Sequence, residues 1–111
     1  MKLALDYDET FTEDPIFWKG VIELAKQRMH SVTFVTFRSN PKGSSYNDDI
    51  YSDANELGVD VVFTSGEQKA GHFDADVWID DMPVVIPHAQ ELLNMYHGCV
   101  RNDDTKPKGG W

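Results

Sequence analysis

Residues 3–10 read LALDYDET, and this stretch decides the fold that the sequence predicts. Its first three residues form a short apolar run that stops at Asp6, which is the pattern of a buried strand bounded by polar residues. A helix is expected next, from Pro15 to Met29, because Asp14-Pro15 is typical of a helix start and apolar residues then recur at helical spacing. The chain therefore begins with a strand followed by a helix.

The same alternation continues along the chain. Ser31 to Thr36 (SVTFVT) is β-branched and aromatic, which predicts a second buried strand. A loop and then a helix around Asp49 to Leu57 follow, and Gly58 is expected to cap that helix at its C-terminus. Val59 to Phe63 and Val77 to Ile79 are predicted as the third and fourth strands. Strands that alternate with helices indicate βαβ units, hence an α/β fold with a parallel sheet covered on both faces.

Four shorter segments complete the prediction. Ser65-Gly66-Glu67-Gln68 matches a capping box, so a short helix is expected to open there. His88 to Met95 is expected to be helical, and Cys99-Val100 to form a fifth strand. The segment 102–111 is polar and rich in Gly and Pro, which is typical of a loosely ordered tail. We therefore expect one domain over residues 1–101 and a tail over residues 102–111.

Composition limits the classes of function. The chain has 111 residues, which fits one domain, and a formal net charge of −9. That charge opposes long-range attraction to nucleic acid or to an anionic membrane. The single cysteine, Cys99, cannot form an internal disulfide, and no stretch approaches the length of a membrane span. A cytoplasmic protein with no membrane partner is the expectation.

Polar residues stand where the predicted strands end. Asp6, Thr36, Thr64 and Asp80 each follow or close an apolar run. In parallel α/β sheets the functional site lies beyond the carboxyl ends of the strands. We therefore expect these side chains to converge on one crevice.

The two carboxylates after the first strand could serve as a nucleophile and as a general acid–base. Asp6 and Asp8 are two residues apart, so they project to the same side at a strand end. One carboxylate can attack phosphorus to form an aspartyl-phosphate. The other can protonate the leaving oxygen and later deprotonate water.

The pattern DxDxT at residues 6–10 resembles the first motif of the haloacid dehalogenase (HAD) superfamily. The remaining motifs of that family follow in order. Thr36, at the end of VTFVT, matches the Ser/Thr that binds the phosphoryl group, and Lys69 matches the motif-three lysine. Asp80-Asp81, after VWI, matches the motif-four acidic pair. Any of these patterns is weak alone, but four in order at strand ends are a strong signal.

The resemblance implies a three-layer Rossmann-like sheet with helices on both faces, and a magnesium cofactor. The implied metal ligands are a carboxylate oxygen of Asp6, the backbone carbonyl of Asp8, and Asp81, with Asp80 in a supporting role. Which member of the Asp80-Asp81 pair binds the ion directly stays open. Lys69 would offset the charge of the nucleophile and the phosphate.

Two further expectations concern the substrate. Thr36 and the amide after it would hold phosphate oxygens, and Arg38 is a candidate for binding a substrate phosphate or carboxylate. The gaps 11–31 and 37–64 are too short for the cap domain that many HAD enzymes insert, so the chain resembles the small capless group. An open crevice admits bulky substrates, or is closed by a second copy of the chain.

The sequence thus predicts a magnesium-dependent phosphohydrolase acting on a nucleotide or another small phosphate ester. A polynucleotide end-phosphatase is an alternative, which the open site favours and the net charge of −9 opposes. A catalytically silent binding module with this fold is another. A receiver-type signalling domain is disfavoured, because its acidic pair would follow the first strand, whereas the pair here follows the fourth.

Overall fold

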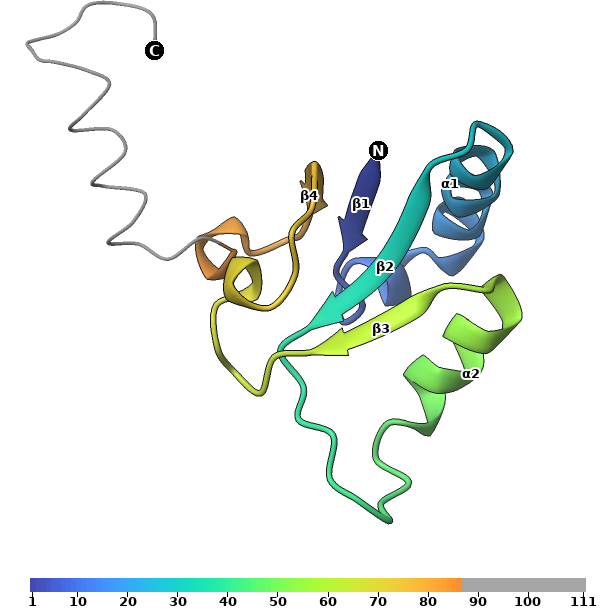
Figure 1. Ribbon diagram of the computed structural model, residues 1–111. Coiled ribbons are helices and arrows are strands. Elements are labelled where there is room, and N and C mark those ends of the chain that lie inside the picture. The colour runs from blue at the N-terminus through green and yellow to red at the C-terminus, as the bar shows by residue number, and fades with distance from the viewer. Residues whose placement is uncertain (87–111) are drawn as a thin grey trace, which may run out of the picture.

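The computed structural model describes residues 1–86 of the chain. Strands and α-helices alternate in it until the fourth strand (Figure 1). The elements are β1 (Lys2–Leu5), η1 (Phe11–Glu13), α1 (Pro15–Gln27), β2 (Ser31–Thr36), α2 (Asp48–Leu57), β3 (Asp60–Phe63), η2 (Lys69–Gly71), β4 (Val77–Ile79) and η3 (Pro83–Val85), where η denotes a 3-10 helix. The predicted α/β class is confirmed, and all four strands in this part of the chain lie within about a residue of their expected bounds.

The four strands form one parallel sheet in the order β3-β2-β1-β4. Leu5 at the end of β1 is in register with Phe34 of β2 and with Ile79 of β4. The residues that follow β1 and β4 therefore leave the sheet at the same edge and side by side. β1 lies in the middle of the sheet, which leaves its carboxyl end flanked on both sides.

The connections reverse direction at β1. From β1 the chain steps to β2 and then to β3, and right-handed crossovers place α1 and α2 on one face of the sheet. Two contacts join these helices: Lys19 forms an ion pair with Glu56 at 3.2 Å, and Lys26 Nζ donates to the carbonyl of Leu57 at 2.6 Å. Both α-helices that the structure describes thus lie on the same face (Figure 1). The chain then returns to the opposite side of β1 to form β4.

The core lies between the sheet and the two α-helices. Phe34 of β2 and Ile50 of α2 are fully buried, and Tyr7 and Phe11 from the segment after β1 are almost as inaccessible. The Phe11 ring packs edge-on against Phe34 with centroids 5.0 Å apart. Each such buried side chain stabilises the fold by about 1.5–3 kcal/mol relative to an exposed one. Tyr7 and Phe11 therefore anchor the segment that carries Asp6 to Thr10.

Residue chemistry explains the start of α1 and the end of α2 as predicted, whereas the end of α1 differs from prediction. Asp14 Oδ1 accepts from the backbone N–H of Phe17 at 3.2 Å and Pro15 is the first helical residue, so α1 starts as expected. Gly58 caps α2 in the left-handed conformation, at φ 66°. The expected end of α1 at Met29 was two residues too late, because Met29 itself is left-handed, at φ 67°.

The capping box predicted at residues 65–68 is wrong. Ser65 and Gly66 both have positive φ, at 54° and 80°, which ends regular structure instead of starting a helix. Their N–H groups bond to the carbonyls of Arg38 and Phe37, so this segment continues to pair with the chain that follows β2. Only the short η2 forms afterwards, without a side-chain cap.

Several expectations lie outside the described residues. These are the helix at His88–Met95, the strand at Cys99-Val100, and the domain boundary at residue 101 with the tail 102–111. Between β1 and β2 the chain holds only η1 and α1, and between β2 and β3 only a loop and α2, so neither connection contains a further domain.

Candidate functional site

The point where the sheet order reverses is the expected place for a ligand, because neighbouring connections there run to opposite faces and leave a crevice. In this sheet the reversal falls between β1 and β4. Asp6 directly follows β1, and Asp80 and Asp81 directly follow β4. The backbone N–H of Asp6 bonds to the carbonyl of Ile79 at 2.9 Å, which holds the two strand ends together.

The three carboxylates at this point form a cluster. One oxygen from each of Asp6, Asp80 and Asp81 lies within 4.8 Å of the others. Asp6 is 8% exposed, Asp80 is half-buried and Asp81 is exposed. Residues 74 positions apart in the sequence therefore meet at one end of the sheet, as the sequence predicted.

Lys69 brings the positive charge into this cluster. Its Nζ lies 2.8 Å from Asp6 Oδ1 and 2.5 Å from Asp80 Oδ2, and the residue is 2% exposed. A lysine is almost never so buried unless it is paired. Because η2 begins at Lys69, the turn after β3 fixes where this ammonium enters the site.

Thr10 connects the two acidic segments. Its hydroxyl lies 3.1 Å from Asp6 Oδ2 and 3.2 Å from Asp81 Oδ1, and it accepts from the backbone N–H of Asp81 at 3.3 Å. The DxDxT pattern includes Thr10 but does not by itself indicate this bridge to the segment after β4. Thr10 is thus a positioning residue for both carboxylates.

The pKa values of two carboxyls in the cluster, Asp6 and Asp81, shift in opposite directions. Burial raises the pKa of Asp6 from 3.8 to about 6, although the bond from Lys69 acts in the opposite direction. The pKa of Asp81 is lowered, first by its hydrogen bond with Asp6. The buried Asp6 is therefore the carboxyl whose ionised form is least favoured by its surroundings, and a bound cation would stabilise that form.

Asp8 is held by an arginine instead of by the cluster. Arg38 donates to both oxygens of Asp8, at 2.9 and 2.7 Å, and to both oxygens of Asp49, at 2.7 and 2.9 Å. The guanidinium also lies over the rings of Tyr7 and Tyr46, and its side chain is 12% exposed. These bonds raise the pKa of Arg38 further above its usual range and lower that of Asp49. The proposed substrate ligand Arg38 therefore orients Asp8.

A crevice of about 200 Å³ opens above the cluster. It is lined by Asp6, Asp8, Glu9, Thr36, Phe37, Lys69, Asp80, Asp81, Met82 and Val85. All the residues that the sequence predicted as catalytic or metal-binding are among them. Arg38 is not, and neither is Thr64, which is buried and has no hydrogen-bond partner for its hydroxyl within residues 1–86.

Sequence reasoning missed part of this lining. Glu9 was passed over although it lies inside the DxDxT pattern, and it reaches the crevice through a left-handed backbone at φ 64°. Phe37, Met82 and Val85 were not singled out either. A signal for Phe37 and Met82 was present, because each directly follows a residue that the motifs identified.

The donor set fits a hard divalent cation. Carboxylate oxygens are the ligands that magnesium prefers, and two opposite oxygens of one magnesium ion are about 4.2 Å apart. The oxygens of Asp6, Asp80 and Asp81 lie at a comparable spacing. Asp80 already uses both oxygens, with Lys69 and with the backbone N–H of Met82, whereas Asp81 is exposed. Of the two residues after β4, Asp81 is thus better placed than Asp80 for direct binding beside Asp6.

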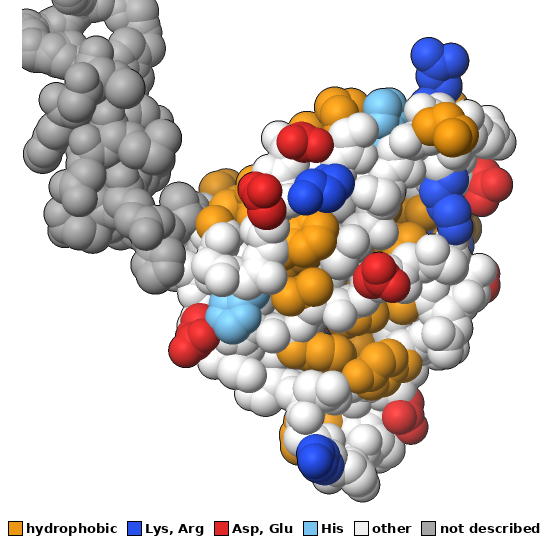
Figure 2. All heavy atoms as spheres, viewed as in Figure 1, with side chains coloured by type: hydrophobic (Ala, Val, Ile, Leu, Met, Phe, Trp, Pro, Cys, Tyr) orange, Lys and Arg blue, Asp and Glu red, His pale blue; other side chains and the backbone are white. Residues whose placement is uncertain are grey.

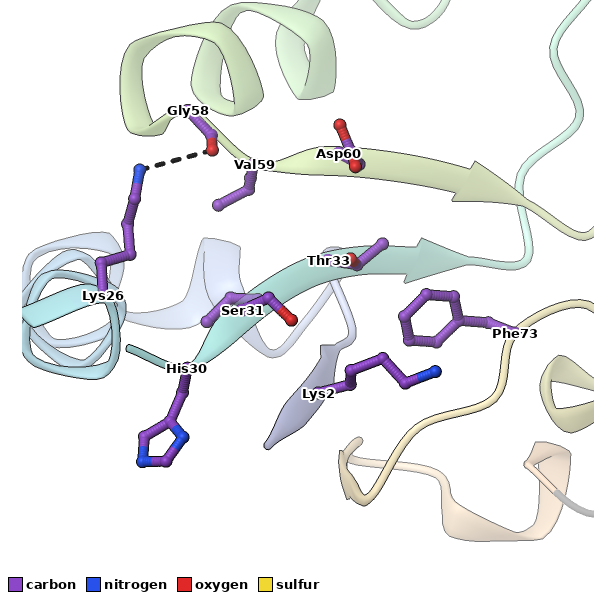
Figure 3. Close-up of a pocket in the computed structure, with 10 residues that line it drawn as sticks. Lys2, Lys26, His30, Ser31, Thr33, Gly58, Val59, Asp60 and Phe73 are labelled. Carbon is purple, nitrogen blue, oxygen red and sulfur yellow. Dashed lines mark hydrogen bonds between the residues drawn. The ribbon is translucent and has the colours of Figure 1, made fainter. Parts of the chain in front are cut away.

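A second, larger hollow of about 370 Å³ lies at the opposite end of the sheet (Figure 3). Lys2, Ser31 and Asp60 from the starts of three strands line part of it. Lys26, at its border, already donates to the carbonyls of Leu57 and Gly58. Among the described residues the three-carboxylate cluster lies only in the smaller crevice, so that crevice is the candidate site.

Comparison of the chain with models of protein families, with curated proteins and with solved structures gives no match in any of the three. Among residues 1–86, no helix has the length and apolar character needed to cross a membrane. The structure establishes an α/β domain with a four-stranded parallel sheet and an acidic cluster that could hold a metal ion.

Proposed function

We propose that this chain is a HAD-like, magnesium-dependent phosphohydrolase that cleaves small phosphate monoesters through an aspartyl-phosphate on Asp6. One observation carries the proposal: the carboxylates of Asp6, Asp80 and Asp81 converge at the switch point of a parallel sheet around a buried lysine. The four HAD-like sequence motifs supply the lining of this single crevice, which supports the family resemblance.

The chain's own residues supply the groups for both steps. In the first, a carboxylate oxygen of Asp6 forms a bond to phosphorus while the ester P–O bond breaks, and Asp8 gives its proton to the leaving oxygen. In the second, Asp8 takes a proton from water, whose oxygen bonds to phosphorus and displaces Asp6. Thr36, 1% exposed at the end of β2, borders the place where the phosphoryl oxygens would lie.

Neutralising negative charge is the main requirement in a site of this kind, because phosphoryl transfer depends on positioning and charge stabilisation. Lys69 supplies one positive charge beside Asp6. Asp6 and Asp81, with the carbonyl of Asp8, would hold a magnesium ion, which supplies electrostatic stabilisation of the phosphoryl oxygens. Asp80 would orient Lys69.

The charge distribution supports a small substrate over a polynucleotide. Figure 2 shows Lys and Arg side chains scattered singly over the described part of the visible face, not gathered into a basic patch. Polynucleotide binding depends on several phosphate contacts from basic side chains. The formal net charge of −9 acts in the same direction.

Turnover of an aryl phosphate with and without magnesium tests the proposal. Wild-type protein should release phosphate only with the metal, and Asp6→Asn should lower the rate by several orders of magnitude, as expected for loss of a nucleophile. Asp60→Asn, an exposed carboxylate at the far end of the sheet, is the matched control and should retain activity. Equal rates for Asp6→Asn and wild type would refute the assigned role.

A further inference from the structure

The candidate crevice is strongly acidic. Five carboxylates line it, those of Asp6, Asp8, Glu9, Asp80 and Asp81, against the single ammonium of Lys69. One magnesium ion and one phosphate group of opposite charge leave that excess of negative charge unchanged. A second anionic group on the substrate would therefore meet like charges at close range, which is unfavourable even in a solvated crevice.

Arg38 offsets the charge of Asp8 but is not available to a second anionic group of the substrate. The Nε and both terminal nitrogens of Arg38 already donate hydrogen bonds to Asp8, Asp49 and Asn47. Two aromatic rings enclose the guanidinium, and it does not line the crevice. Binding a carboxylate or a second phosphate would require Arg38 to leave partners that already satisfy it.

The uncharged part of the lining has a definite arrangement. Phe37 follows β2, and Met82 and Val85 lie after β4, so these apolar side chains reach the crevice from the segments that follow the two strands flanking β1. Phe37 is 39% exposed and Met82 is 53% exposed, which leaves apolar surface available at the mouth of the crevice. These side chains border the same crevice as Asp6.

We propose that the crevice selects phosphate monoesters whose leaving group is uncharged and carries a flat apolar ring, bound between Phe37 and Met82. This inference rests on the proposed function, since it concerns the substrate of the same site. The lining carboxylates repel a second anionic group on the substrate, and the apolar side chains at the mouth of the crevice contact the ring of the leaving group. Nucleoside or aryl monophosphates fit this description, whereas diphosphates and polynucleotides do not.

Three esters with similar leaving alcohols separate the effects of ring and charge: ethyl phosphate, benzyl phosphate and 4-carboxybenzyl phosphate. We expect kcat/KM with magnesium to be highest for benzyl phosphate and lower for the other two. Phe37→Ala should reduce the benzyl-to-ethyl ratio by about five- to tenfold, the usual scale of an aromatic contact. Phe37→Trp should preserve the ratio.

Controls make the test specific. Phe17→Ala removes an exposed ring from α1, outside the crevice (54% exposed, against 39% for Phe37), and should leave the benzyl-to-ethyl ratio unchanged. Glu9→Gln should raise the relative rate for the carboxybenzyl ester, because it removes one lining charge. Circular dichroism of each variant establishes that the fold is retained.

The outcomes distinguish the two proposals. If none of the three esters is hydrolysed, the proposed function fails and this inference falls with it. If ethyl phosphate is hydrolysed and benzyl phosphate is no better, or the carboxybenzyl ester is preferred, the substrate inference alone is overturned. An unchanged benzyl-to-ethyl ratio in a folded Phe37→Ala protein overturns the assignment of the ring contact.

Discussion

Replacing the buried carboxylate with its neutral isostere should stabilise the metal-free protein. Asp6 is 8% exposed, and burial raises its pKa from 3.8 to about 6. At neutral pH the folded protein must therefore hold this carboxylate ionised in an environment that favours the protonated form. Asp6→Asn mimics the protonated form, because its amide can donate to Asp81 and its oxygen can accept from Lys69.

The sign and size of the effect follow from proton linkage. Between pH 3.8 and about 6 the folded state holds a proton at Asp6 that the unfolded chain has released, so the free energy of unfolding falls as pH rises. Above that window the loss is complete. A shift of about two pH units corresponds to about 3 kcal/mol, which is an upper limit for a group coupled to Lys69 and Asp81.

Urea unfolding in EDTA measures this directly. At pH 7.5 Asp6→Asn should be more stable than wild type by about 1–3 kcal/mol, and the difference should shrink toward zero near pH 4. Asp60→Asn, at an exposed carboxylate at the far end of the sheet, is the control substitution. A variant less stable than wild type at pH 7.5 would refute the reasoning, because it would mean that the ionised Asp6 contributes to the fold.

Three other substitutions test the surroundings of the site. Lys69→Met should destabilise the protein by about 3–5 kcal/mol in chemical unfolding, because it leaves two buried carboxylates without their cation; a smaller loss than for an exposed lysine would contradict the buried pairing. Gly58→Ala should lower the free energy of unfolding in urea by about 1 kcal/mol or more, since φ is 66° and a Cβ would lie 2.8 Å from Lys26 Nζ; an unchanged free energy of unfolding would argue against the left-handed cap. Asp49 has a lowered pKa through Arg38, so its contribution to stability is present above pH 3.8 and is lost as pH falls through the folded-state pKa; Asp49→Asn should flatten the acid side of a stability–pH curve, and an unaltered curve would exclude this contribution.

The sheet and its site edge were predictable because the sequence expresses them locally. Each strand is an apolar run that stops at a polar residue, so the ends of β1 and β4 were visible as Asp6 and Asp80. The helix start at Asp14-Pro15 and the stop at Gly58 depend on single-residue chemistry that the sequence also shows. The parallel arrangement then places the strand ends at one edge.

The interactions that the sequence did not reveal depend on tertiary contacts. Nothing in the order of residues indicates that Arg38 pairs with Asp49, eleven positions later. Arg38 also pairs with Asp8, so its guanidinium binds two carboxylates of the chain and not the substrate. The capping-box pattern at residues 65–68 failed because pairing with the chain after β2 overrides a local helix signal. The bridge from Thr10 to Asp81 requires β1 and β4 to be neighbours, which only the folded sheet establishes.

Binding of a divalent cation tests the central claim most directly. Titration with manganese, followed by the electron paramagnetic resonance of the free ion, should show one site in wild-type protein that magnesium displaces. Asp81→Asn should weaken that site at least tenfold, whereas Asp60→Asn should leave it intact. Manganese affinity unchanged by Asp81→Asn would contradict the proposal that the residues after β1 and β4 share one metal ion.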